Sequence, residues 1–287
     1  MPHRFKPAAT QTNKAGAARQ RGVFPAIHFD YVLAVFACRP LLTILAGSDS
    51  SALFVCVRAG TTGRGIGRPM VIFDCNGVLV DSEPLATAII SQEFMRAGFA
   101  LTPDIVARYF TGRRPADIFA EVEIAAGRKL PADFAATVAS ATLRRFRAEL
   151  RATKHMSYAL SWLRGPKCVA SSSSLDRIRV SLESTDLVRF FEPYLFSAGD
   201  VRNGKPAPDL FLHVSAKMGV PPGDCIVVED SPVGVAAGVA AGMTVVGFVG
   251  GSHAGIQLAS HLRAAGARAV ISDMRALKST IIDLRGW

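Results

Sequence analysis

The residues with the clearest capacity for chemistry are polar side chains that end runs of apolar residues. Asp74 follows the apolar run 71–73, and Asn76-Gly77 comes almost directly after it. Such a run, stopped by a carboxylate and an Asn-Gly pair, is typical of a buried parallel strand. Ligands of open α/β sheets bind at the carboxyl ends of the strands. Asp74 is therefore placed to act as a nucleophile or to bind a cation.

Three other polar groups stand at comparable places farther along the chain. Lys205 lies between a Gly and a Pro, Glu229 and Asp230 end the apolar run 226–228, and Ser171 and Ser172 follow the run 168–170. Carboxylates at a sheet edge suit Mg²⁺, which takes only a few protein ligands and keeps several waters. An ammonium group beside an anionic nucleophile would offset its repulsion for an anionic substrate. All of these groups would meet if their strands shared one sheet.

The pattern of the chain predicts such a sheet. Short strand-like runs alternate with helical patterns after residue 155, which favours a doubly wound, Rossmann-like α/β core with a parallel sheet. The expected strands are 167–171, 193–197, 225–230, 244–249 and 269–272, and the expected helices are 156–164, 175–182, 208–218, 232–241 and 255–265. Between the first strand and this core lie only helical patterns, at 84–97, 103–109, 115–126 and 132–150. We therefore expect a small all-helical cap inserted after the first strand.

These motifs, in this order, resemble the haloacid dehalogenase superfamily, near the β-phosphoglucomutase and 6-phosphogluconate phosphatase type. The resemblance covers about residues 70–287. It implies a core formed by residues 70–83 and 155–287, and a cap formed by residues 84–154. It also implies Mg²⁺ as the cofactor and a small phosphorylated substrate, a sugar phosphate or sugar-acid phosphate. The phosphoryl group would be hydrolysed through an aspartyl-phosphate intermediate.

The resemblance also assigns roles to single residues. It makes Asp74 the nucleophile, and it makes Ser171, Ser172 and Lys205 the groups that bind the phosphoryl oxygens. The expected metal ligands are Asp74, Asn76 through its backbone carbonyl, Glu229 and Asp230, with Glu229 binding either directly or through a water. Asp230 is expected to be the more direct ligand of the last two.

A loop of the cap carries two further candidates. In the resembled family, the loop at residues 110–115 reaches over the active site and touches the substrate. Arg113 and Arg114 would clamp a second anionic group there, a carboxylate or a phosphate, with two hydrogen bonds. The alternative is that they are two solvated arginines in a turn.

Asn76 departs from the superfamily pattern Asp-x-Asp-Gly, because the chain has Asp74-Cys75-Asn76-Gly77. The second acid of that pattern binds the metal through its carbonyl and transfers a proton through its side chain. An amide keeps the first role and loses the second, which is typically worth about 10²–10⁴ in rate. The sequence therefore predicts binding of Mg²⁺ and phosphate, with slow turnover of ordinary sugar phosphates unless another group or water transfers the proton.

Charge is unevenly distributed over the 287 residues. Residues 1–69 hold nine Lys and Arg against two acids, while the rest of the chain is nearly balanced. A nucleic-acid-binding domain would carry its own basic face, so we expect no nucleic-acid partner. The apolar runs 31–38 and 41–47 are shorter than the ~18–20 residues of a membrane span. We expect residues 1–69 to be an unstructured basic extension or the product of a misplaced start, with an organelle transit peptide as the alternative.

Five cysteines without paired spacing argue against a disulfide framework or a zinc site. A reducing, cytoplasmic location fits this composition, and we expect a monomer or small homo-oligomer. The leading hypothesis is thus a phosphoric monoester hydrolase. The alternative from another class is a catalytically impaired phosphate-binding or regulatory protein on the same scaffold. A sugar-phosphate mutase is less favoured, because it depends even more on the proton transfer that Asn76 lacks.

Overall fold

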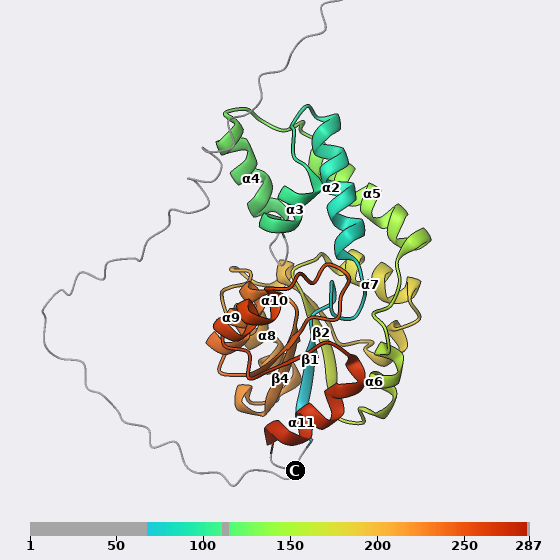
Figure 1. Cartoon of the computed structure of the whole chain (residues 1–287), viewed down its shortest axis with the longest axis vertical. Helices are drawn as coiled ribbons and strands as arrows, with labels where there is room; N and C mark the ends of the chain where they lie inside the picture. Colours follow the sequence, from blue (N-terminus) through green and yellow to red (C-terminus); the bar gives the residue numbers. More distant parts are fainter. Residues whose placement is uncertain (1–67, 111–114, 286–287) are drawn as a thin grey trace, which may run out of the picture.

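The sheet at the centre of the molecule has six parallel strands. The computed structural model describes residues 68–110 and 115–285 (Figure 1). Its strands follow the order β3-β2-β1-β4-β5-β6, with every neighbouring pair parallel. They are β1 (Met70–Phe73), β2 (Lys167–Ser171), β3 (Leu195–Ser197), β4 (Cys225–Glu229), β5 (Thr244–Phe248) and β6 (Ala269–Ile271). The predicted doubly wound, Rossmann-like architecture is confirmed.

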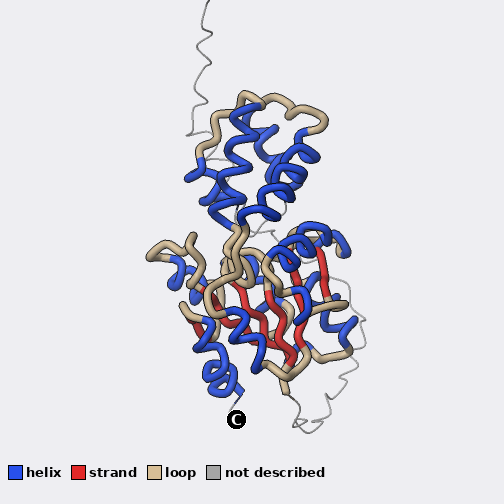
Figure 2. Tube along the Cα trace, turned by 90° about the vertical axis from the view of Figure 1, so that its right-hand side faces the viewer, coloured by secondary structure: helices blue, strands red, loops and turns tan. Residues whose placement is uncertain are grey.

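Helices cover both faces of this sheet (Figure 2). One face packs against α6 (Met156–Trp162), α7 (Leu175–Ser184) and α11 (Leu277–Arg285), and the other against α8 (Asp209–Met218), α9 (Pro232–Ala240) and α10 (Leu258–Ala264). Successive strand residues alternate between the faces, so Val71 and Phe73 join the first cluster while Met70 and Ile72 join the second. Within the described residues, four single-turn 3₁₀ helices complete the core, at Val188–Phe190, Ala198–Asp200, Pro222–Asp224 and Met274–Ala276.

Four helices form a separate layer above the carboxyl ends of the strands (Figure 1). They are α2 (Glu83–Arg96), α3 (Pro103–Phe110), α4 (Pro115–Ala126) and α5 (Phe134–Glu149). Their apolar sides meet in a hydrophobic cluster of their own around Phe94. The Phe94 ring lies 4.7–6.0 Å, centroid to centroid, from four other phenylalanine rings. No helix in the described ranges is both long and apolar enough to span a membrane.

Two adjacent segments join the cap to the core. The backbone N–H of Asp81 donates to the carbonyl of Arg151 at 3.0 Å, and the N–H of Thr153 donates to the carbonyl of Leu79 at 3.0 Å. The outgoing and returning connections therefore run side by side (Figure 2). This arrangement holds the cap helices over the end of β1.

The strand order also fixes where a ligand can bind. From β1 the chain winds outward through β2 and β3 on one side, then returns to continue through β4, β5 and β6 on the other. The crevice beyond the carboxyl ends of β1 and β4 lies at this change of direction, where open α/β sheets bind their ligands. Asp74 directly follows β1 and Asp230 directly follows β4, so both stand at this crevice.

Candidate active site

Asp74, Lys205 and Glu229 form a buried charged group at the end of β1. The Nζ atom of Lys205 lies 2.5 Å from Oδ1 of Asp74 and also donates to Oε1 of Glu229. A third, longer contact reaches the carbonyl of Ala170 at 3.3 Å. The side chains of Lys205 and Glu229 are each only 1% exposed. The structure thus brings together residues that are 131 positions apart in the sequence.

Glu229 is held by protein donors on both of its oxygens. One oxygen accepts from Lys205, and the other accepts from the N–H of Asp230 at 3.1 Å and from the N–H and Oγ of Ser231 at 3.1 and 3.0 Å. A Cβ on Gly234 would come within 2.0 Å of this carboxylate, so only glycine fits at the start of α9. Glu229 therefore orients Lys205 and has few lone pairs left for other ligands.

The charges in this group perturb one another. Burial alone would lower the pKa of Lys205, but the carboxylates of Asp74 and Glu229 outweigh it and raise that pKa above its ordinary value. Burial raises the pKa of Asp74, and Glu229 and Asp230 add to this rise, against the opposing effect of Lys205. Two buried carboxylates contact one ammonium, and the buried carboxylate of Asp230 acts on Asp74 as well, so the group is short of positive charge.

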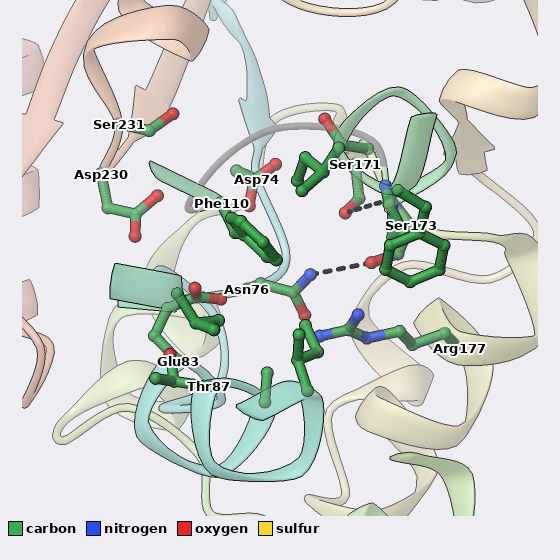
Figure 3. A pocket seen from close by; sticks show the side chains of 17 residues that line it. Asp74, Asn76, Glu83, Thr87, Phe110, Ser171, Ser173, Arg177, Asp230 and Ser231 are labelled. Atoms are coloured by element: carbon green, nitrogen blue, oxygen red, sulfur yellow. Dashed lines mark hydrogen bonds between the residues drawn. The ribbon is translucent and has the colours of Figure 1, made fainter. Parts of the chain in front are cut away.

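Asp230 stands beside this group and faces the pocket (Figure 3). Its Oδ2 atom lies 2.9 Å from Nε2 of His253, a residue that the sequence reasoning did not single out. Burial raises the pKa of Asp230 to about 6, although the contact with His253 acts in the opposite direction. Gly77 has φ +73°, and a Cβ there would lie 1.9 Å from this same Oδ2. The Gly of the Asn-Gly pair is thus required because Asp230 packs directly on it.

Serines at the end of β2 form the opposite wall of the pocket. Ser171 is 1% exposed, and its Oγ accepts from the N–H of Ser173 at 3.3 Å. The side-chain amide of Asn76 donates to Oγ of Ser173 at 2.8 Å, which ties the loop after β1 to the loop after β2 (Figure 3). Ser172 also lines the pocket. The Oδ1 atom of Asn76 is buried without a hydrogen-bond partner among the described residues.

The cap forms the remaining wall, which is mostly apolar. It is built by Ala86, Ile90, Val106, Phe110, Ile118 and Phe119, from α2, α3 and α4. The candidates Arg113 and Arg114 lie outside the described residues, in the short segment between Phe110 and Pro115, both of which line the pocket. A further pocket residue that the sequence reasoning missed is Arg177, in the first turn of α7.

The site has the chemistry that Mg²⁺ requires. No three His, Cys, Asp or Glu side chains within 68–110 and 115–285 converge as a complete metal site. Mg²⁺, however, needs only one or two carboxylates, because it keeps several waters. Asp74 and Asp230 both line the pocket, and the closest nitrogen recorded for the buried Oδ2 of Asp230 is Nε2 of His253, with which it makes no hydrogen bond of good geometry. Asp74 and Asp230 would hold a divalent cation, which would supply the missing positive charge.

Comparison with known proteins identifies the family. Residues 69–242 match the model of the haloacid dehalogenase-like hydrolases, and the chain belongs to this family. A conserved haloacid dehalogenase-like protein of unknown function from Agrobacterium tumefaciens has a similar crystal structure, with 36% identity and a TM-score of 0.66. That similarity covers 76% of this chain and 100% of the other.

Several named relatives of this chain are phosphatases. The 6-phosphogluconate phosphatase of Escherichia coli is 33% identical over 184 residues, which cover 64% of this chain and 83% of the relative. The validoxylamine A 7'-phosphate phosphatase of Streptomyces hygroscopicus is 30% identical over 182 residues, or 62% of this chain and 84% of the relative. A family hydrolase from Deinococcus radiodurans, with bound phosphate and sodium in its crystal structure, is 28% identical with a TM-score of 0.61. Its similarity covers 75% of this chain and 96% of the other.

Proposed function

We propose that this protein is a Mg²⁺-dependent phosphatase of a small phosphorylated metabolite, a sugar phosphate or a sugar-acid phosphate. One observation carries the proposal: Asp74 is buried at the carboxyl end of β1, paired with Lys205, and lines a pocket together with Ser171. The 6-phosphogluconate phosphatase and validoxylamine A 7'-phosphate phosphatase relatives support the reaction type and the substrate class.

Asp74 would act as the nucleophile in two successive displacements. Its carboxylate oxygen attacks phosphorus, and the bond between phosphorus and the substrate oxygen breaks; the leaving oxygen then takes a proton from water, because Asn76 cannot supply one. Water then attacks the phosphorus of the aspartyl-phosphate, which releases inorganic phosphate and regenerates Asp74. Lys205 offsets the repulsion between the nucleophile and the anionic phosphoryl group. The hydroxyl of Ser171 and the N–H groups near the start of α7 would bind the phosphoryl oxygens.

The metal ligands in this proposal are Asp74, Asp230 and the backbone carbonyl of Asn76. When bound, Mg²⁺ would neutralise charge that develops on the transferred phosphoryl group. Glu229 would support the metal through a water and would hold Lys205, in keeping with its protein hydrogen bonds. The buried and negatively charged surroundings favour a divalent over a monovalent cation.

A second candidate function follows from Asn76. Its amide donates to Ser173 and cannot supply the proton that an alkoxide leaving group needs. A protein of this kind would bind Mg²⁺ and phosphorylated ligands but turn them over slowly, and could serve as a phosphate-binding or regulatory protein. The two functions differ in whether physiological alkyl phosphates are hydrolysed.

An assay with an aryl phosphate tests the proposed phosphatase first, because its leaving group needs little protonation. We expect hydrolysis in the presence of Mg²⁺, a loss of it with excess chelator, and no activity in Asp74→Asn. Asp104→Asn, at an exposed position of α3, is the matched control and should retain full activity. Turnover by purified Asp74→Asn equal to that of the unmodified protein would refute the assignment. A panel of alkyl phosphates then separates the phosphatase from the binding protein.

A further inference from the structure

Arg177 is a cation in the pocket that the proposed reaction does not use. It belongs to the first turn of α7, and its guanidinium carbon lies 4.9 Å from the centre of the Phe146 ring. Figure 3 shows the guanidinium extending from α7 toward the middle of the pocket, near Asn76. Its Nε atom is buried and has no hydrogen-bond partner among the described residues.

The charge of Arg177 is incompletely balanced by the protein. Within 68–110 and 115–285, no carboxylate forms an ion pair with it, and the acid with the largest effect on it is Glu83. One oxygen of Glu83 accepts instead from the neighbouring Ser82 hydroxyl at 3.3 Å. Burial lowers the pKa of Arg177, with Glu83 opposing this. A partly buried guanidinium whose Nε lacks a hydrogen bond and whose charge no carboxylate of the described residues pairs is unfavourable, so an anionic ligand would relieve a cost that the folded chain already carries.

The position of Arg177 distinguishes it from the phosphate-binding groups. Lys205 and Ser171 surround Asp74, whereas in Figure 3 Asn76 lies between Asp74 and Arg177. Among the described residues that line this pocket, Arg177 is the only Lys or Arg. A ligand whose phosphoryl group meets Asp74 would therefore direct another part of its structure toward the guanidinium. The planar fork of Arg suits a carboxylate, which it can bind through two parallel hydrogen bonds.

We infer that Arg177 recognises a carboxylate of the substrate, and that the substrate is a phosphorylated sugar acid rather than a neutral sugar phosphate. This inference rests on the proposed phosphatase function and deepens it by naming the substrate class. Arg177 is then a specificity-determining residue, while the apolar wall of the cap excludes water from the remainder of the pocket.

Two open-chain substrates test the inference. Gluconate 6-phosphate and glucitol 6-phosphate have the same length and differ only at carbon 1, which is a carboxylate in one and a hydroxymethyl group in the other. We expect a higher kcat/KM for gluconate 6-phosphate. Arg177→Gln should lower that kcat/KM by about 10- to 100-fold, the range for losing hydrogen bonds to a charged group, mainly through KM. For glucitol 6-phosphate the change should stay below about 3-fold, since no charge-assisted contact is lost.

Two further variants guard against a purely structural effect. Arg179→Gln, two residues along α7, removes an exposed arginine that pairs with Glu192 at 3.0 Å, and it should leave both substrates unchanged. Arg177→Lys keeps the charge and much of the contact with Phe146 but loses the planar guanidinium that can make two parallel hydrogen bonds. Its kcat/KM for gluconate 6-phosphate should therefore lie between those of the unmodified protein and Arg177→Gln. If Arg177→Gln fails to fold, the ratio of kcat/KM for gluconate 6-phosphate to kcat/KM for glucitol 6-phosphate decides the question, measured in Arg177→Lys and in the unmodified protein.

The outcomes separate this inference from the proposed function. Equal losses for both substrates, or no loss for either, would overturn the role of Arg177 while leaving the phosphatase intact. If the unmodified protein hydrolyses neither compound, calorimetric titration of each with Mg²⁺ present replaces the kinetics. Binding of gluconate 6-phosphate that weakens selectively in Arg177→Gln would then support carboxylate recognition, even though the phosphatase proposal had failed. Indistinguishable binding of the two compounds would overturn it.

Discussion

Replacing Lys205 by Met would remove the ammonium that contacts two buried carboxylates, those of Asp74 and Glu229. The side chain of Lys205 is 1% exposed and contacts both Asp74 and Glu229. Met has a similar length and no charge, so the variant tests the electrostatic role of Lys205 with little change in packing. Without this cation, Asp74 and Glu229 face each other as uncompensated buried charges.

The expected cost follows from this geometry. Breaking a buried ion pair by removing one partner typically lowers the free energy of unfolding by about 3–5 kcal/mol. For a domain of this size, that corresponds to a fall in melting temperature of about 6–20 °C. The cost should depend on pH, because loss of Lys205 pushes the raised pKa of Asp74 still higher. A carboxyl group whose pKa is higher in the folded than in the unfolded state destabilises the fold most at neutral pH, and this penalty shrinks as the pH falls and the group takes up a proton.

Denaturant and thermal unfolding at pH 7.5 and pH 5 would measure this effect. The samples should contain chelator, since Mg²⁺ near Asp74 would supply part of the missing charge. Lys217→Met is the matched control, because Lys217 is an exposed lysine in the last turn of the nearby helix α8. We expect Lys217→Met to match the unmodified protein at both pH values.

Two results would refute this reasoning. A loss below about 1 kcal/mol at pH 7.5 would show that the carboxylates do not need Lys205, because exposed ion pairs contribute only that much. A large loss that is the same at pH 5 and pH 7.5 would indicate a packing defect rather than uncompensated charge.

Three further changes have defined outcomes. Asn76→Asp should raise the turnover of alkyl phosphates by about 10²-fold, with a smaller gain for aryl phosphates. If freshly prepared protein, in which Asn76 has not deamidated, already turns over alkyl phosphates as fast as Asn76→Asp, then Asn76 does not impair the enzyme. Since the pKa of Asp230 is raised to about 6, Mg²⁺ must compete with a proton below that pH. The affinity of the protein for Mg²⁺, measured by calorimetry, should fall from pH 7.5 to pH 5. A constant affinity would show that Asp230 is not a metal ligand. Gly77→Ala should weaken Mg²⁺ binding and lower the melting temperature, because a Cβ at this left-handed position would displace Asp230; unchanged binding would contradict that contact.

Local sequence pattern was sufficient to predict the main elements of the core. A buried parallel strand is apolar on both faces and ends where a polar or turn-forming residue interrupts it, so its limits are visible in the residues themselves. The expected strand 167–171 coincides with β2, and the expected strand 225–230 differs from β4 by one residue. The same logic placed Asp74 and Asp230 at strand ends. The final helix, α11, was not anticipated from the sequence pattern.

Only the tertiary structure decided how the charged groups share their contacts. Glu229 and Asp230 are adjacent carboxylates; Asp230 was expected to be the more direct metal ligand, but the sequence does not show what Glu229 contacts. The fold turns Glu229 toward Lys205 and the N–H groups that begin α9, while Asp230 faces the pocket. Side chains of neighbouring residues on a strand point to opposite sides, and the partners available on each side come from distant parts of the chain.

Arg177 and His253 belong to the site, although the sequence does not distinguish them from other arginines and histidines. In the sequence, Arg177 is one of several arginines near a helix start, and His253 lies in a glycine-rich connection without a ligand motif. Their proximity to Asn76 and Asp230 arises from the strand order, which brings the ends of β1, β2, β4 and β5 to one crevice. Residue types and their spacing thus determined which groups could do chemistry at the sheet edge. Long-range packing determined which of them meet, because contacts across the sheet depend on strands that are separated by tens of residues along the chain.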